Sequence, residues 1–206
     1  MDAYSLGLFA YYNIEMRRRV FLAINLDHAT IARIERMIAD KEMFGGESGF
    51  GIRFLKPENW HITLSFLGYQ DEDSIFRIIN AALEAVRGIP PQKIELDKSL
   101  YGPPDKNPRM IWISASPETS RRLNKIKNLF EDKLEGLGVA FRRENREFHA
   151  HVTVARFEKS FRKSSLPPLG QPVNLKLEAQ NLDLMESELK RGGAEYTILQ
   201  RFPFKR

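Results

Sequence analysis

The chain has 206 residues, of which 42% are hydrophobic and 29% are charged. This length fits one large domain or two small lobes that share a core, and the composition is ordinary for a folded soluble protein. There is no cysteine, which excludes disulfides and thiolate metal sites, and no apolar run is long enough to span a bilayer. The formal net charge of +5 suits a polyanionic partner, but it fits a solvated basic surface equally well.

The first residues of the chain differ from those that follow. Leu6 to Tyr12 are apolar, but no basic segment precedes them and no small-residue cleavage site follows, so they do not resemble a secretory signal. Met16-Arg-Arg-Arg19 then opens a strand pattern. We therefore expect residues 1–15 to be an N-terminal extension and residues 16–206 to form a single bilobal domain, with two interleaved lobes, of a cytoplasmic protein.

The first half of the chain alternates strand and helix patterns. Asp27 is suited to cap the first helix, and Asp71 to Asp73 give the second helix an acidic start. The expected segments are a strand at 20–24, a helix after Asp27 with Ile31, Ile34, Met37 and Ile38 on one face, a glycine-rich break at 44–50, strands at 52–55 and from His61, a helix at 71–87 and a strand at 93–100.

The second half repeats this order less completely, since nothing in it matches the helix at 71–87. Ser116-Pro-Glu118 has the cap-then-proline form of a helix start, and Gly136 and Gly138 end that helix. The other expected segments are a strand at 110–113, a basic run at 141–148, a strand from His151, a loop at 163–172, and strands at 175–185 and 196–199.

Two short motifs within this pattern combine histidine and threonine. One is His61-Ile-Thr-Leu-Ser-Phe-Leu-Gly68 and the other is His151-Val-Thr-Val-Ala-Arg156. Because side chains alternate along a strand, His61 and Thr63 share one face, as do His151 and Thr153. A single histidine on a strand is more often structural than catalytic. The second copy is what points to a site.

The spacing of the two motifs indicates an internal duplication. Phe21 precedes His61 by 40 residues, and Ile111 precedes His151 by the same 40 residues. Each interval runs through a strand, a helix and a glycine-containing break. This predicts an α+β fold with two pseudo-symmetric lobes, each with a small antiparallel sheet and outer helices, whose His-x-Thr strands face a central cleft.

Two histidines and two threonines around one cleft suit acid–base chemistry on a phosphodiester. A neutral imidazole can take a proton from the nucleophile while a protonated one gives a proton to the leaving group. Hydroxyls of Thr63 and Thr153 can donate hydrogen bonds to oxygens that gain charge. The Arg156 guanidinium suits phosphate, but its odd spacing from His151 brings it to the site only if the strand twists, bulges or ends first. A cyclic phosphodiester fits this combination, and it needs no metal.

A metal site is the first alternative. His149 and His151 share a strand face, but the chain has no carboxylate or cysteine at ordinary zinc-ligand spacing around them. We therefore expect no metal and no other cofactor, and we expect His149 to be a rim residue or a substrate contact. His28 opens a helix beside its cap, and we expect no chemical role for it.

At these motifs the sequence resembles the two-histidine (2H) phosphoesterases, and within them the RNA 2′,3′-cyclic phosphodiesterases, also called 2′-5′ RNA ligases. The resemblance covers about residues 17–199. Two departures, Ala150 where proline is frequent and Ser65-Phe-Leu-Gly-Tyr69 without the usual lysine and glutamate, concern substrate fit. The resemblance rests on Arg-Arg-Val-Phe-Leu-Ala-Ile at 18–24, Glu58 to Gly68, Phe148 to Arg156, Leu184 to Leu189 and Gly193 to Tyr196.

The resemblance implies hydrolysis of a 2′,3′-cyclic phosphate at an RNA 3′ end to a 2′-phosphate. It implies His61 as the proton donor to the leaving 3′-oxygen and His151 as the proton acceptor from water. Thr63, Thr153 and Arg156 would hold the phosphate. The motifs alone do not order acid and base, because they are nearly symmetric. The implied partner is RNA with a cyclic phosphate end or a cyclic nucleotide, with no membrane and no obligate protein partner.

Other functions stay open from the sequence. Another phosphodiester is one possibility, such as a 2′-5′ linkage, a cyclic ADP-ribose phosphate, or the reverse ligation. A nucleotide- or RNA-binding module without turnover is another, although the motif residues are intact. Basic residues could extend the site along RNA, and Phe66 or Trp60 could stack on a base if either faces the cleft. For most of these residues the ordinary interpretation, solvated charges and core aromatics, is favoured. These basic residues are Arg17 to Arg19, Arg121, Arg122, Arg142, Arg143 and Arg146.

Overall fold

We describe the protein from a computed structural model. The described residues are 17–39, 52–103, 108–157, 169, 172–191 and 193–205. The expected extension at 1–15, the break at 44–50 and nearly all of the loop at 163–172 lie outside them.

The helices and strands follow the expected order within the described residues. A 3₁₀ turn at Pro57–Asn59 leads into the His61 strand. The elements are β1 (Arg18–Asn25), α1 (His28–Ala39), β2 (Ile52–Phe54), β3 (His61–Gln70), α2 (Glu72–Val86), β4 (Gln92–Gly102), β5 (Met110–Ala115), α3 (Pro117–Gly136), β6 (His151–Phe157), β7 (Pro172–Ala179), β8 (Asn181–Lys190) and β9 (Gly193–Pro203).

The expected helix caps are confirmed. The Asp27 carboxylate accepts a hydrogen bond from the Thr30 amide at 2.6 Å, and Asp71 accepts one from the Ser74 amide at 2.7 Å. Ser116 caps α3 in the same way. Each cap satisfies an amide that the first turn of a helix leaves without a partner, and it therefore sets where the helix begins.

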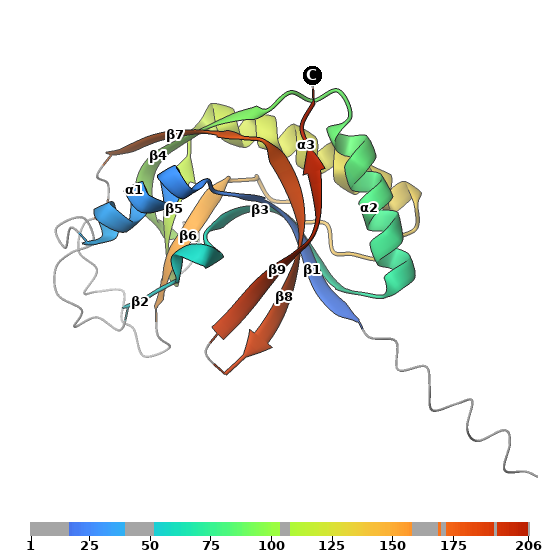
Figure 1. The fold of residues 1–206 in the computed structure, drawn as a ribbon, viewed down its shortest axis with the longest axis horizontal. Coiled ribbons are helices and arrows are strands. Elements are labelled where there is room, and N and C mark those ends of the chain that lie inside the picture. The colour runs from blue at the N-terminus through green and yellow to red at the C-terminus, as the bar shows by residue number, and fades with distance from the viewer. Residues whose placement is uncertain are drawn as a thin grey trace, which may run out of the picture.

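All the strands belong to one antiparallel sheet in the order β7-β4-β5-β6-β3-β1-β8-β9, with β2 on β6. The α+β class is thus confirmed, and Figure 1 shows the sheet curving round between the helices. The two small sheets that we expected are joined into one, because Ile62 of β3 pairs with Val152 of β6. The two His-x-Thr strands are therefore direct neighbours.

The lobes exchange strands. We call β3, β1, β8 and β9 the first lobe, and β6, β5, β4, β7 and β2 the second lobe. Strand β4 follows α2 in the chain but pairs with β5 and β7, whereas β8 comes late in the chain and pairs with β1. Each lobe therefore contains strands from both halves of the chain.

The prediction of one strand at 175–185 is wrong. The chain breaks at Gln180, where β7 leaves β4 and β8 joins β1. The pattern of burial explains the break. In β7 the odd-numbered residues from Val173 to Ala179 are buried, whereas in β8 the phase shifts so that Leu182 and Leu184 enter the core. A change of phase in a period-two pattern requires a bend or a new strand.

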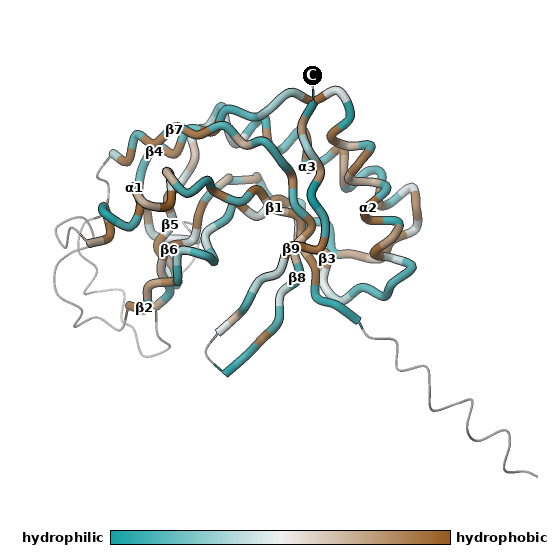
Figure 2. Tube along the Cα trace, viewed as in Figure 1, coloured by the Kyte–Doolittle hydropathy of each residue, from teal (hydrophilic) through white to brown (hydrophobic). Residues whose placement is uncertain are grey.

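One large core lies between the sheet and the helices. It contains Phe130 of α3, Ile78 of α2 and Ile34 of α1, all fully buried against strand residues such as Leu22 and Ile113. Figure 2 shows apolar colour where β1, β3, β8 and β9 cross, and a mostly hydrophilic or neutral far end of β8–β9. In the described part of the chain, no helix is both long enough and apolar enough to span a bilayer.

Candidate active site

The pairing of β3 with β6 brings the two His-x-Thr motifs together. Ile62 pairs with Val152, and both side chains are fully buried. The flanking residues therefore project to the opposite face, and the antiparallel direction sets His61 toward Thr153 and Thr63 toward His151. All four line one cavity of about 400 Å³. This size is within the range of small-molecule sites.

A bulge in β6 brings Arg156 to the same cavity. Trp112 of β5 pairs with Thr153, but the preceding Ile111 pairs with Ala155, so Val154 is an extra residue in β6. A bulge reverses the alternation of side chains beyond it. Arg156 therefore projects on the side of Thr153, is exposed, and lines the cavity despite its odd spacing. Arg156 was expected to reach the site only if the strand twists, bulges or ends first, and the bulge fulfils this condition.

The matching point of β3 carries the same irregularity. Thr63 pairs with Ala23 and Ser65 pairs with Leu22, so Leu64 is the extra residue. Phe66 then takes the position that Arg156 has in the other motif. Its side chain is 56% exposed and lines the cavity, whereas Trp60 is 3% exposed and belongs to the core. Of the two aromatic residues considered for base stacking, Phe66 faces the cleft.

Each histidine ring is held by a backbone group two residues earlier. His151 Nδ1 donates a hydrogen bond to the carbonyl oxygen of His149 at 2.7 Å, because a carbonyl can only accept. His61 makes the equivalent hydrogen bond with the backbone of Asn59. In neutral His151 the proton therefore lies on Nδ1, and Nε2 keeps a lone pair free to accept another.

Aromatic neighbours distinguish the two rings. The Trp112 indole stacks on His151, with 3.7 Å between ring centroids and 20° between planes. A Cβ added to Gly102 would lie 2.2 Å from the Trp112 ring, so only glycine leaves room for it. The His61 ring instead lies beside Phe21, in a tilted arrangement, and beside Tyr196, edge to face, with 5.0 Å between ring centroids in each pair. Trp112 was not among the residues predicted for the site, although its alternation with buried Ile111 and Ile113 places it on the cleft face.

The end of the β8–β9 hairpin bounds the cavity on the side of His61. Tyr196 of β9 lines the cavity, and the Asn59 side-chain amide donates to the Ala194 carbonyl at 3.3 Å. The contact ties the hairpin to the turn that precedes His61. Figure 1 shows this hairpin projecting from the body of the sheet.

Both histidines are electrostatically biased toward the neutral form. Burial lowers the pKa of His61 to about 4, and the nearby His151 and Arg156 act in the same direction. Burial likewise lowers the pKa of His151 to about 4, with smaller contributions from Arg146 and His149. Hydrogen bonds to the backbone partly oppose both shifts. A bound anion would favour the protonated form and raise these pKa values.

Of the three arginines in the basic run at 141–148, two line the active-site cavity and one does not. Arg143 is held by Glu131, Asp132 and Glu135 at 3.3, 2.6 and 3.1 Å, and it lies outside the active-site cavity. Arg142 and Arg146 do line it. Contact with RNA was only one possibility for Arg143, and its three ion pairs give it a structural role instead.

The remaining predicted candidates lie as follows. His149 is exposed at the rim, with Nε2 at 3.9 Å from Glu147. His28 is exposed at the start of α1, away from the cavity lining. Arg18 pairs with Glu186 at 3.5 Å outside the cavity, and Arg122 pairs with Glu118. Among the described residues, no three His, Cys, Asp or Glu side chains are grouped to hold a metal ion.

Comparison with known proteins agrees with this geometry. The profile of the family described as LigT like Phosphoesterase matches residues 32–112. An RNA 2′,3′-cyclic phosphodiesterase of Archaeoglobus fulgidus is 30% identical in an alignment of 191 residues that covers 89% of this chain and 99% of that protein. The chain belongs to the LigT-like phosphoesterase family. It is therefore an enzyme of the two-histidine phosphoesterase superfamily.

Further members show the same extent of similarity. The RNA 2′,3′-cyclic phosphodiesterase of Methanocaldococcus jannaschii is 30% identical and matches over 89% of this phosphoesterase and 99% of its own length. The crystal structure of E. coli LigT with 3′-AMP superposes with a TM-score of 0.72 at 22% identity, covering 92% of this chain and 99% of that one. A Thermus thermophilus structure gives 0.70 at 24% identity, with coverage of 90% and 97%. These two structural matches establish the LigT-like fold.

Proposed function

We propose that this phosphoesterase hydrolyses 2′,3′-cyclic phosphate ends of RNA to 2′-phosphates. The observation that carries the proposal is the cavity in which both His-x-Thr pairs and Arg156 converge. The names of the relatives from Archaeoglobus and Methanocaldococcus support the same substrate. The catalytic pair would be His61 and His151, with Thr63, Thr153 and Arg156 as phosphate ligands.

The reaction is an in-line displacement at phosphorus. His151 Nε2 takes a proton from water while the water oxygen forms a bond to phosphorus. The bond between phosphorus and O3′ breaks, and His61 gives its proton to O3′, which leaves the phosphate on O2′. The protein supplies the proton transfers at the two imidazoles.

The two threonines and the arginine would stabilise the charge that develops on the non-bridging oxygens. Thr63 and Thr153 lie beside the opposite histidine, so their hydroxyls flank a phosphate placed between the two rings. Donors positioned in advance at such oxygens favour the transition state over the substrate. The Arg156 guanidinium adds a positive charge on the same side.

The neighbours of the two histidine rings support His151 as the base and His61 as the acid. The base must be neutral to accept a proton, and burial against the face of Trp112 favours the neutral form of His151. The acid loses its positive charge, which the neighbouring charge of Arg156 favours at His61. The assignment agrees with the family resemblance.

The first prediction tests the reaction with a short RNA that ends in 2′,3′-cyclic phosphate. In the presence of a chelator, the wild type is expected to produce a 2′-phosphate end, identified by chromatography against 2′- and 3′-phosphate standards. His61→Ala and His151→Ala should each reduce kcat by about 10²–10⁴-fold, because each removes one proton transfer. His28→Ala is the matched control and should retain wild-type activity, since His28 is exposed away from the cavity. Unchanged turnover in either site variant would refute the mechanism.

The same chemistry with another nucleophile would join a cyclic phosphate end to an RNA 5′-hydroxyl through a 2′-5′ linkage. The hydroxyl would then replace water, His151 would take its proton, and His61 would give a proton to O3′ as in the hydrolysis. Comparing turnover of a cyclic phosphate end with that of a 2′-5′-linked dinucleotide decides which substrate is preferred. We expect the cyclic end to be preferred.

A further inference from the structure

A second cavity adjoins the active site, and we propose that it binds the RNA nucleotides on the 5′ side of the cyclic phosphate. The inference rests on the proposed function and extends it from the terminal nucleotide to an oligonucleotide. The cavity has a volume of about 640 Å³ and lies between β4–β5, α3 and the segment 143–149. We call it the α3 groove.

The α3 groove lies next to the active site and shares lining residues with it. Trp112, Lys127 and His149 line both cavities, as do Arg146 and Phe148. Trp112 is the stacking partner of His151, so the groove begins directly beside one of the two catalytic candidates. An RNA chain whose 3′ end lies between the histidines would therefore enter the groove past the side chains of Trp112 and His149.

Strand pairing gives the groove a row of side chains that leads away from His151. Ser114 of β5 pairs with His151 on one side and with Lys98 of β4 on the other. Directly paired residues of antiparallel strands project to the same face. Lys98 thus lies two strand spacings from His151, roughly 10 Å between backbones.

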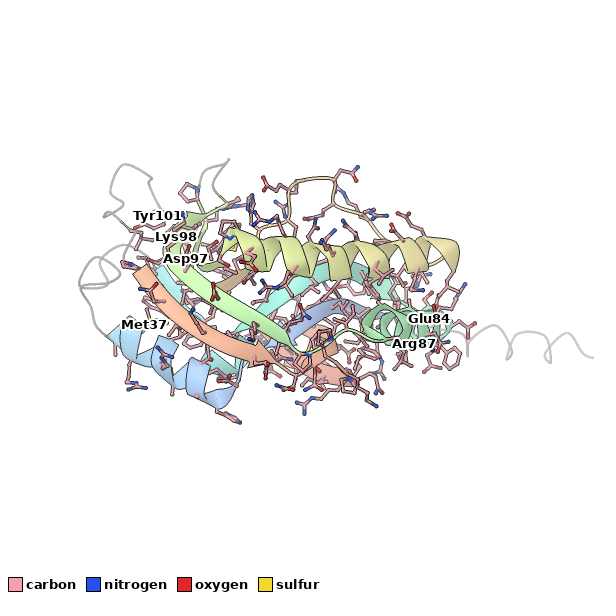
Figure 3. All side chains as sticks on the ribbon, turned by 90° about the horizontal axis from the view of Figure 1, so that it is seen from above. Met37, Glu84, Arg87, Asp97, Lys98 and Tyr101 are labelled. Atoms are coloured by element: carbon pink, nitrogen blue, oxygen red, sulfur yellow. The ribbon has the colours of Figure 1, made fainter. Side chains whose placement is uncertain are left out.

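Lys98 reaches this row because of a bulge at Asp97. The pairing of β4 with both neighbours shifts between Leu96 and Lys98. Before the bulge Leu96 enters the core, and after it Lys98 and Leu100 line the groove. Figure 3 shows Asp97 and Lys98 together on β4, at the N-terminal end of α3.

The opposite wall is a polar stripe on α3. Arg121, Asn124 and Asn128 line the groove at positions i, i+3 and i+7, which share one face of a helix. Amide side chains both donate and accept hydrogen bonds, which suits base edges and sugar hydroxyls. The stripe has none of the apolar character of the core-facing side of α3, where Leu123 and Phe130 are fully buried.

The charges of the groove leave two cations for phosphates. Five lysine or arginine residues and three aspartate or glutamate residues line it. Lys127, Arg143 and Arg146 already form ion pairs with carboxylates at 2.7, 2.6 and 2.8 Å. Within the described ranges, Lys98 and Arg121 have no carboxylate at ion-pair distance. One lies on each wall, so a phosphodiester backbone between them would contact both.

The test compares two substrates and two matched variants. The substrates are 2′,3′-cyclic AMP and an adenosine trinucleotide that ends in 2′,3′-cyclic phosphate. The groove variant is Lys98→Ala with Arg121→Ala, and the control is Lys125→Ala with Arg33→Ala, which removes the same charge from exposed positions outside the groove. The wild type is expected to have a higher kcat/KM on the trinucleotide, and the groove variant should lose that advantage while its kcat/KM on 2′,3′-cyclic AMP stays unchanged.

Salt dependence gives a second measure of the same contacts. Loss of two phosphate contacts should reduce the slope of log affinity against log salt by about 1.4 for single-stranded RNA. Affinity is measured with a fluorescent trinucleotide that ends in 2′-phosphate, so this measurement does not depend on turnover. The control variant should keep the wild-type slope for the trinucleotide.

The outcomes separate this inference from the proposed function. If the wild type turns over neither substrate, the proposed reaction is wrong, and the binding measurement alone decides on the groove. If both substrates are turned over equally well, or if the groove variant behaves like the control in turnover and in salt slope, the α3 groove does not bind RNA.

Discussion

At the scale of single residues, the two histidines have the same backbone support and different neighbours. Both rings hydrogen-bond to a backbone group two residues earlier. His151 lies flat against Trp112, whereas His61 meets Phe21 and the edge of Tyr196. A near-symmetric pair of motifs therefore becomes a pair with distinguishable chemistry.

We expect Trp112 to position His151 and to keep its pKa low. Trp112→Leu removes the stacked face and admits water, so the pKa of His151 should rise toward its ordinary value of about 6.5. The acidic limb of the kcat profile should then move to higher pH, and kcat should fall at neutral pH. Trp112→Phe retains an aromatic face, so it should keep most of the wild-type kcat at neutral pH and an acidic limb close to that of the wild type. A pH profile in Trp112→Leu identical to that of the wild type would exclude the role.

Gly102→Ala tests the same contact, because its Cβ would lie against the Trp112 ring. The new Cβ would displace the Trp112 ring, so this variant should reproduce the pH profile of Trp112→Leu. Gly136→Ala is the matched control, because a Cβ added there meets nothing within 4 Å.

The lowered pKa values also predict how the rate responds to pH. The acid must be protonated to react, and kcat/KM reports the free enzyme, in which the pKa of His61 is about 4. A bound phosphate anion raises that pKa, so kcat should stay high to a higher pH than kcat/KM does. Full pH–rate profiles on the cyclic substrate test the order of the two alkaline limbs. Coincident limbs would contradict the expected effect of the phosphate.

At the scale of strands and helices, bulges determine which side chains reach the site. Extra residues at Leu64, Asp97 and Val154 re-aim Phe66, Lys98 and Arg156 toward the cavities. Alternation along the sequence was enough to predict the His-x-Thr faces, because those residues precede the bulges. It could not predict the side of Arg156 or Lys98, since a bulge is set by the register of the neighbouring strands.

The bulge in β3 also connects the site to α3. Ser65 turns toward the core, where its hydroxyl donates to Glu131 Oε1 at 2.7 Å. Glu131 Oε2 accepts from Lys127 at 2.7 Å, and both charged side chains are buried, at 2% and 8% exposure. The pair anchors the strand that carries His61 and Thr63.

Glu131→Gln should destabilise the protein by about 3 kcal/mol or more, because it leaves the buried Lys127 charge without its partner. Urea denaturation measures this free energy of unfolding. Glu84→Gln, which breaks the exposed pair with Lys133, is the comparison and should have little effect. Equal stability of the two variants would show that the buried pair contributes nothing.

At the scale of the whole molecule, the duplication predicted the fold class and the meeting of the two motifs. The matched 40-residue intervals are strand–helix–strand units in both halves, as the sequence indicated. Interleaved lobes were expected, but the strands that they exchange could not be predicted, because apolar alternation indicates a strand and does not identify its partners. The two halves match in the spacing and order of elements around the motifs, yet neither half corresponds to one lobe.

This exchange sets an order of assembly during synthesis. Strand β1 can pair with β3 early, but its other edge waits for β8, whose paired residues begin 160 positions later, with Asp183 opposite Ala23. An open strand edge is a template for association with other chains. We therefore expect the nascent chain to expose this edge of β1 until β8 has left the ribosome, and to be prone to association with other chains for most of its synthesis.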